Sequence, residues 1–248
     1  MNFPVYLPDF MIPARYFVIA GVFFFIFYIF RKNYYSHLKI QERVPDKKMI
    51  YSEIVFSFFT MLIFVAIDYI IIYLKNYNYL MIYDDVSEYG TLYLILSTVF
   101  LIVFHDFYFY LTHRMLHHKK LFFMHRRHHL SINPTPWAAF SFGPIEAVIQ
   151  IIWIPIVAFF VPLHFYALLV WSFFMMIMNV IGHLGYEIFP KNFLDSFIGK
   201  ILLSSTYHNL HHSRSKSNFG LYFTFWDKIM GTEDKNYRLT YEKIKETN

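Results

Sequence analysis

The chain contains no cysteine among its 248 residues. Disulfide bonds and thiolate metal sites are therefore excluded, and any bound metal must be held by nitrogen and oxygen. Charge is also scarce, because only 16% of the residues are charged, whereas soluble domains carry about 25%. Apolar residues make up 57% of the chain. This composition indicates an integral membrane protein.

The basic excess is small, with a net charge of +5. Lys and Arg number 6 in residues 31–50, 5 in 113–131 and 9 in 183–248, against 1 in 1–15 and 1 in 75–90. Rich and poor segments thus alternate, as the positive-inside rule requires of a chain that crosses a membrane five times with its N-terminus outside. We attribute the charge to topology and expect no nucleic-acid binding.

Apolar runs predict an all-α integral membrane protein with about four to five transmembrane helices and a cytoplasmic His-rich helical cap. We expect helices over residues 16–30, 50–74, 91–104, 145–161 and 165–181. The third run continues without a helix breaker into the first histidines. The last two are separated by Pro162-Leu163-His164 and form a predicted hairpin, which returns the chain to the face that it left. Asp68, inside the second run, is a functional candidate or a satisfied structural residue.

Histidine is abundant where the spans end. His208, His211 and His212 repeat the His-x-x-His-His spacing of His125, His128 and His129. Residues at i, i+3 and i+4 share a helix face, so we expect each triplet to aim its rings at a common centre. Nine histidines exceed the needs of one zinc ion and suit two metals, although imidazole alone does not choose among iron, zinc and copper. The candidate ligands are His113, His117, His125, His128, His129, His183, His208, His211 and His212.

Other polar residues near these ligands receive weaker assignments. Asp106 and Tyr110 lie on the helical stripe of His113, where we expect them to hold the free ring nitrogens of ligands. For His105, displaced by roughly 80° from His113 on a helix, we favour an interfacial position over a ligand-supporting or substrate-contacting one. We expect His118 to point away from the site, and His37 and His164 to be interfacial histidines with no role.

The histidines lie in four ordered boxes, HRMLHH (113–118), HRRHH (125–129), NVIGH (179–183) and HNLHH (208–212). The segment NFGLYFTFWDKIMGT (218–232) follows the last box. Together they resemble the fatty acid hydroxylase and sterol desaturase superfamily over roughly residues 100–232. The family's opening Asp-x-x-x-Tyr-x-x-His-Arg-x-x-His is matched by Asp106, Tyr110, His113, Arg114 and His117. Asn179 stands where hydroxylase members of the family often have another histidine. This difference favours the sterol-desaturase-like branch, and Asn179 would bind a metal through a water molecule or not at all.

The resemblance implies a membrane oxidoreductase in which the nine histidines hold two iron ions on the cytoplasmic face. It would use O₂ to hydroxylate or desaturate a sterol or fatty-acyl lipid, in a bacterial inner membrane or the endoplasmic reticulum. Residues 1–90 would be N-terminal spans and 91–248 the catalytic domain, with a membrane hairpin at 145–181 and a cytoplasmic tail at 183–248. No nucleotide or haem fingerprint is visible, so electrons would come from an external b-type cytochrome, ferredoxin or reductase. We expect Phe219–Trp226 to line the floor of the site.

Two other classes of function remain open. A zinc-dependent membrane hydrolase would need a glutamate base beside paired histidines, and Glu146 and Glu187 are the nearby candidates. A metal-storage or metal-transport protein would place its ligands inside the spans, whereas these histidines lie at span ends.

Overall fold

The computed structural model describes residues 11–246, and most of them are helical. Within that range, four helices are long and apolar enough to cross a membrane. They confirm the prediction of an all-α membrane protein, although the first begins at Met11 and the second extends three residues further toward the N-terminus than the apolar run. These helices are α1 (Met11–Phe24) with its π-helical continuation η1 (Phe25–Phe30), α2 (Lys47–Asn76), α3 (Gly90–Leu116) and α7 (Phe165–Gly182).

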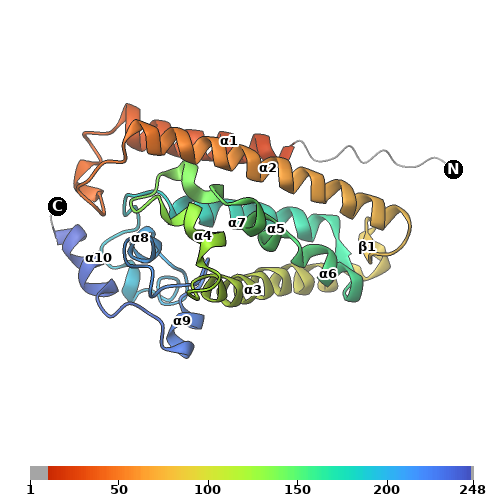
Figure 1. Cartoon of the computed structure of the whole chain (residues 1–248). Coiled ribbons are helices and arrows are strands. Elements are labelled where there is room, and N and C mark those ends of the chain that lie inside the picture. The colour runs from red at the N-terminus through yellow and green to blue at the C-terminus, as the bar shows by residue number, and fades with distance from the viewer. Residues whose placement is uncertain (1–10, 247–248) are drawn as a thin grey trace.

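The predicted hairpin is present, but its first arm is broken. It consists of α5 (Pro144–Ile151) and α6 (Trp153–Phe160), which together extend about 25 Å and fall short of a bilayer core of about 30 Å. The turn of the hairpin carries β2 (Leu163–His164), which pairs in parallel with β1 (Ile82–Tyr83). The loop before α3 and the hairpin turn therefore lie at one end of the bundle, and α3 and α7 begin there (Figure 1).

His164 ties this end together. Its Nδ1 accepts a hydrogen bond from the backbone N–H of Tyr166 at 2.9 Å, which caps α7, and its Nε2 donates to the carbonyl oxygen of Asp84 at 3.0 Å. The ring is 1% exposed. The expectation of an interfacial histidine without a role was therefore wrong, because the chain turn at Pro162 buries the ring between two loops.

A short 3-10 helix, η4 (Pro136–Phe140), joins the spans near their other end. The Tyr16 hydroxyl of α1 donates to the Trp137 carbonyl oxygen at 2.8 Å, and the Ser57 hydroxyl of α2 donates to the same oxygen at 2.7 Å. The three elements share one apolar core with α3 and α5–α7. The division of the chain at residue 90 stays a prediction.

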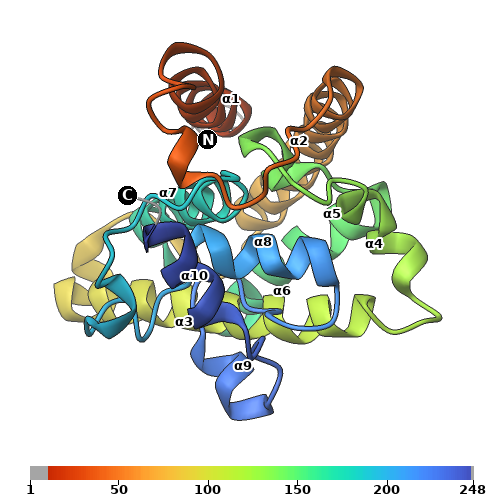
Figure 2. The same cartoon turned by 90° about the vertical axis from the view of Figure 1, so that its left-hand side faces the viewer.

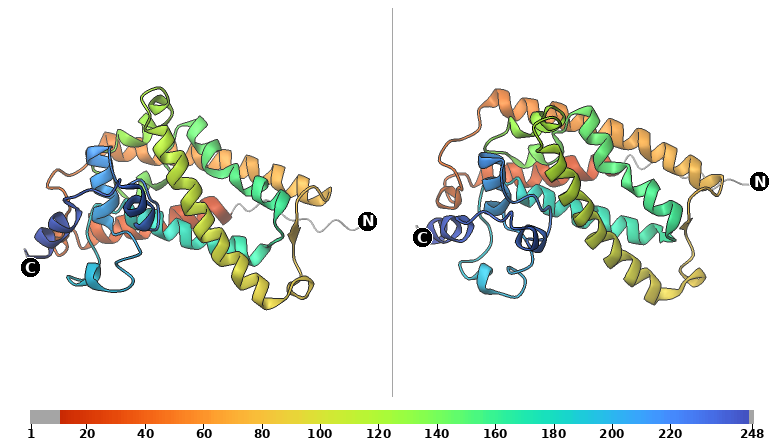
Figure 3. Two further views of the ribbon diagram at one scale, coloured as in Figure 1. Left: turned by 90° about the horizontal axis from the view of Figure 1, so that it is seen from below. Right: turned by 60° about the horizontal axis from the view of Figure 1, so that its bottom comes forward.

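The cap consists of short helices gathered at the end of the bundle opposite the β strands. In Figure 2, α8 lies at its centre among α3, α4, α7 and α10, and Figure 3 shows α3 crossing the bundle obliquely to meet α4. The cap helices are α4 (Phe122–His129), α8 (Ser205–Arg214), α9 (Phe225–Met230) and α10 (Tyr237–Glu246). Single 3-10 turns also occur at η2 (Ser36–Leu38), η3 (Val86–Glu88) and η5 (Phe193–Asp195).

Candidate metal centre

All nine candidate histidines meet where the spans reach the cap. Eight are buried, and His117 is half-buried. They come from four elements, which are the end of α3 (His113 and His117), α4 (His125, His128 and His129), the C-cap of α7 (His183) and α8 (His208, His211 and His212). The histidines therefore lie at span ends, where a transport pathway through the membrane would not place them.

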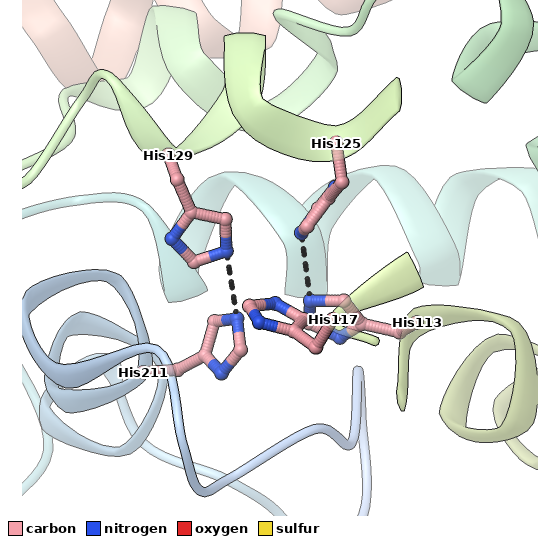
Figure 4. A group of neighbouring side chains, drawn as sticks. All are labelled: His113, His117, His125, His129 and His211. Carbon is pink, nitrogen blue, oxygen red and sulfur yellow. Dashed lines mark hydrogen bonds between the residues drawn. The ribbon is translucent and has the colours of Figure 1, made fainter. Parts of the chain in front are cut away.

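The rings form two groups, and within each group one ligand atom per residue lies within 4.8 Å of all the others. The five-histidine group, drawn in Figure 4, contains His113, His117, His125, His129 and His211. The four-histidine group contains His128, His183, His208 and His212. Each of the nine candidate histidines lies in one of the two groups. Two groups agree with the two metals that the number of histidines predicts.

The grouping differs from the expectation that each triplet serves one centre. His125 and His129 lie in the five-histidine group, but His128 between them lies in the four-histidine group. In α8, His208 and His212 lie in the four-histidine group, whereas His211 lies in the other. On a helix of about 100° per residue, i+4 lies about 40° to one side of i and i+3 about 60° to the other. Each triplet therefore sends its i, i+4 pair to one group and its middle histidine to the other.

Most of the Nε2 atoms point inward, and five of the Nδ1 atoms bond a carbonyl or carboxylate oxygen outside the groups, whereas those of His128 and His208 have no partner among the described residues. In the five-histidine group, Nδ1 of His113 donates to the Phe219 carbonyl oxygen at 2.9 Å and Nδ1 of His125 to the Glu146 carboxylate at 2.5 Å. The Nδ1 of His211 donates to the Ser217 carbonyl oxygen at 2.7 Å.

In the four-histidine group, two of the Nδ1 atoms have such partners. There, Nδ1 of His183 donates to the Asn179 carbonyl oxygen at 2.7 Å, and Nδ1 of His212 to the Ser131 carbonyl oxygen at 2.9 Å. A carbonyl oxygen only accepts, so each of these Nδ1 atoms carries the ring proton and leaves Nε2 as a bare acceptor in neutral imidazole.

Bare Nε2 atoms are nevertheless packed against each other. The Nε2 atoms of His113 and His125 are 3.0 Å apart, and those of His183 and His212 are 3.1 Å apart. The Nδ1 atoms of His183 and His212 both face carbonyl oxygens, so their Nε2 atoms have no proton to share and repel, and a cation between them would stabilise this arrangement. The donor set of both groups therefore fits a bound metal ion.

The spacing also bears on the kind of metal. With metal–nitrogen bonds of about 2.1 Å, adjacent ligands lie about 3.0 Å apart in octahedral geometry and about 3.4 Å apart in a tetrahedron. The Nε2 separations of 3.0 Å (His113 to His125) and 3.1 Å (His129 to His211) match the octahedral edge. Five histidines also exceed the four ligands of a structural zinc site. The five-histidine group thus suits a metal of higher coordination better than tetrahedral zinc.

Burial keeps these rings neutral. It lowers the pKa of His117 and of His183 to about 4. It also holds the pKa of His125, His211 and His212 well below the ordinary value, and neighbouring histidines add to the effect. Neutral imidazole is the form that binds a metal, so the rings are ready for coordination near neutral pH.

Asp106 and Tyr110 form hydrogen bonds with residues that follow α8. Asp106 accepts hydrogen bonds from the backbone N–H groups of Leu221 and Tyr222, at 3.2 and 2.6 Å, and so anchors the segment that follows α8. The Tyr110 hydroxyl lies 2.9 Å from the Thr232 hydroxyl. In the structure, these hydrogen bonds of Asp106 and Tyr110 join α3 to residues 218–232, and the expectation that the two residues hold ligand rings stays a prediction.

Asn179 supports a ligand through its backbone. Its carbonyl oxygen holds His183, and its side-chain amide donates to the Ala139 carbonyl oxygen at 2.7 Å. Phe219, at the start of the predicted floor, packs on His117 with ring centres 5.2 Å apart. His118 is exposed, as expected.

Glu146 holds the ring of a candidate ligand, His125, and the sequence did not predict this role. It is fully buried in the first turn of α5, and its carboxylate faces Nδ1 of His125 and not the Nε2 side where a metal would lie. Its signal in the sequence was an acidic residue at the start of an apolar run, next to a cluster of histidines. Glu187 is also engaged, because it accepts from the backbone N–H groups of Thr206 and Phe189.

An apolar cavity of about 190 Å³ lies between the spans and extends to Phe142 and Asn179, which contact the four-histidine group. Phe142 and Asn179 line it next to the four-histidine group, and Asp68 lines it in the α2 segment. His105 also lines it, with its Nδ1 2.6 Å from the Tyr222 hydroxyl and only 3% of its surface exposed. The interfacial assignment of His105 was therefore wrong, because α3 crosses the bundle obliquely and turns this ring inward.

Comparison with known proteins identifies relatives that align with more than half of the chain. The chain is 31% identical over 153 residues to a Δ7-sterol 5(6)-desaturase of Gibberella zeae, an alignment that covers 61% of the chain and 46% of the relative. It is 34% identical over 158 residues to the lathosterol oxidase of Homo sapiens, which covers 62% of the chain and 51% of the relative. The mouse lathosterol oxidase is 30% identical over 202 residues, covering 80% of the chain and 66% of the relative.

The chain spans about half the length of the first two of these relatives. No solved structure matches it. The family model for the fatty acid hydroxylases matches residues 98–232, the region that carries all nine histidines, and this confirms the resemblance of the histidine boxes. The chain belongs to the fatty acid hydroxylase family.

Proposed function

We propose that this protein is a membrane-bound, O₂-dependent oxidoreductase that hydroxylates or desaturates a C–H bond of a lipid in lipid biosynthesis. One observation carries the proposal. An apolar cavity between the spans approaches the four-histidine group at Phe142 and Asn179, and the nine histidines converge in two groups with the spacing of metal ligands. The cavity accounts for a hydrocarbon substrate, and the histidines account for an oxidising metal centre.

Two iron ions would occupy the histidine groups, one in each. Bound iron supplies the activation of O₂ that oxidation of an unactivated C–H bond requires. The protein's own residues would orient the ligands and exclude water. Hydrogen bonds from Nδ1 to Phe219, Glu146, Ser217, Asn179 and Ser131 fix the ring orientations, and Phe142 and Phe219 exclude water beside them.

A sterol is the substrate class that the relatives favour. Among them are Δ7-sterol 5(6)-desaturases and lathosterol oxidases, which act on sterols according to their names. The cavity agrees with an apolar substrate, because Ile151, Ile154 and Trp171 line its membrane part. We therefore place the chain with the sterol-desaturase-like members of the family.

Electrons would come from a separate donor, which is a b-type cytochrome, a ferredoxin or a reductase. Arg114, Lys119 and Lys120 are exposed beside the histidines and give this end of the molecule a positive surface. The basic segments 31–50 and 183–246 lie at the same end (Figure 1). The positive-inside rule then puts the metal centre on the cytoplasmic face, of the endoplasmic reticulum or of a bacterial inner membrane.

The alternative functions have less support. In a zinc-dependent hydrolase, a glutamate would contact the water on the metal. Glu146 faces the outer nitrogen of His125, and Glu187 accepts from two backbone N–H groups. Neither is placed to act as a base at the metal. A metal-transport function would need ligands along the spans, whereas the two histidine groups lie at the end of the bundle.

Lipid profiling tests the proposal directly. Membranes from cells with and without the protein would be compared for lipids that gain one oxygen atom or lose two hydrogen atoms. In parallel, purified protein would be assayed for metals and for O₂ consumption with a reduced donor and a Δ7-sterol. About two irons per chain and a new lipid product are expected. One zinc or none, with no O₂ consumption, would refute the proposed function.

A further inference from the structure

Gln150 stands out among the residues of the cavity. It is a polar side chain in an apolar environment, only 8% exposed, and it belongs to the cavity lining. Its Nε2 has no hydrogen-bond partner among the described residues, 11–246. A buried amide without a partner is costly, and native proteins retain such groups chiefly where a ligand or water satisfies them. None of the histidine contacts described above involves this side chain.

The position of Gln150 relates it to the metal centre. Glu146 and Gln150 are four residues apart on α5, so they share a helix face, about 6 Å apart along the axis. Glu146 holds His125, and Gln150 therefore lies one turn from that contact, toward the membrane part of the cavity. Beyond Gln150, the same helices contribute the apolar Ile151 and Ile154 to the lining.

We propose that Gln150 is a specificity-determining residue that binds the hydroxyl group of a lipid alcohol, close to the carbon that reacts. The proposal rests on the proposed function and names its substrate class as a sterol. An amide both donates and accepts, which matches a hydroxyl group. The substrate then enters with its hydroxyl-bearing ring toward the histidines and its hydrocarbon end toward β1 and β2.

The alternative substrate class leaves Gln150 unsatisfied. A fatty acyl chain that carried its carboxyl group at the far end of the cavity would present only methylene groups beside Gln150. A ring hydroxyl places an oxygen a few bonds from the ring carbons that could react. A site built to hydrogen-bond a substrate hydroxyl strongly rejects the analogue that lacks it.

The test uses the full chain in detergent micelles and two tritiated probes, a Δ7-sterol and the corresponding hydrocarbon without the ring hydroxyl. Binding is measured on metal-free protein, and turnover on iron-loaded protein with a reduced donor. Gln150→Leu removes the amide at similar volume, and Gln150→Met is a second variant in case the first misfolds. Ser97→Ala is the matched control, because Ser97 is a buried polar residue outside the cavity lining, and its hydroxyl donates to the Leu94 carbonyl oxygen at 3.1 Å.

We expect Gln150→Leu and Gln150→Met to raise the Kd for the sterol, and to lower its kcat/KM, by about ten- to a hundredfold. Binding of the hydrocarbon should be unchanged in both Gln150 variants, and Ser97→Ala should resemble the wild type with both probes. Equal losses for both probes, or no loss for the sterol, would overturn the proposal. So would wild-type protein that binds no sterol; the proposed oxidoreductase function would survive that result if the iron-loaded protein oxidised another lipid.

Discussion

His128 and His211 are the middle histidines of the two triplets, and each lies with the outer pair of the other triplet. His128 of α4 joins His208 and His212, with 4.5 Å between the ring centres of His128 and His212. His211 of α8 joins His125 and His129, and its Nε2 is 3.1 Å from that of His129. A metal in either group would thus bind α4 to α8.

Removal of one middle histidine should empty one group and not the other. His128→Ala leaves three histidines in the four-histidine group, so we expect bound iron to fall from about two ions per chain to about one. Elemental analysis of the purified protein after dialysis against a weak chelator gives the count. His118→Ala is the control, because His118 is a neighbouring but exposed histidine. Two irons retained in His128→Ala would contradict the assignment.

Glu146 should control metal affinity without binding the metal. Its carboxylate fixes the ring of His125, and loss of such a partner typically weakens metal binding about 10- to 100-fold. We expect Glu146→Ala to show a loss in this range in a competition titration with a chelator. Glu146→Gln keeps an acceptor oxygen and should lose less, and the exposed Glu242→Ala should lose nothing. Equal affinity of Glu146→Ala and the wild type would exclude this role.

Gly185 should be required for the position of His183. It has φ +76°, and a Cβ there would lie 2.5 Å from the Tyr28 hydroxyl and 3.0 Å from the Pro134 carbonyl oxygen. The Tyr28 hydroxyl is itself held by the Leu184 carbonyl oxygen at 2.9 Å. Gly185→Ala should therefore cost about 1–2 kcal/mol of backbone strain and a similar amount for the clash.

Gly90→Ala separates the cost of backbone strain from the cost of the clash. Gly90 has φ +81°, but a Cβ at this position would have no neighbour within 4 Å, so this variant meets the backbone strain alone. Thermal unfolding in detergent should give a clearly lower Tm for Gly185→Ala than for Gly90→Ala. Equal Tm values would mean that Tyr28 and Pro134 move aside without cost.

Glu187 should make stability depend on pH. Burial raises its pKa above 4.5, although hydrogen bonds to Thr206 oppose the shift. The folded state then binds more protons than the unfolded state between pH 4.5 and the raised pKa, so stability falls as pH increases through this window. Glu187→Gln cannot ionise and should flatten the dependence of Tm on pH. An unchanged slope in Glu187→Gln would assign the pH dependence to another group.

Much of the architecture followed from local properties of the sequence. Apolar runs located the four long helices and the hairpin, because each span must satisfy its backbone internally and needs a minimum length. The spacing of Lys and Arg indicated that the histidine boxes share one face. The identity of six of the nine candidate ligands was also local, since His-x-x-His-His on a helix brings three rings within reach of one another.

The distribution of those rings between two centres was decided only by the tertiary structure. Rings at positions i+3 and i+4 of one helix point in directions about 100° apart around the helix axis. Which of them faces a given centre depends on where the opposite helix lies. The placement of α4 against α8 is set by loops and by packing against α3 and α7, which no local pattern encodes. The same holds for Glu146 and His105, because their partners lie 21 and 117 positions away in the chain. Gln150 likewise faces a cavity whose walls come from helices far apart in the sequence.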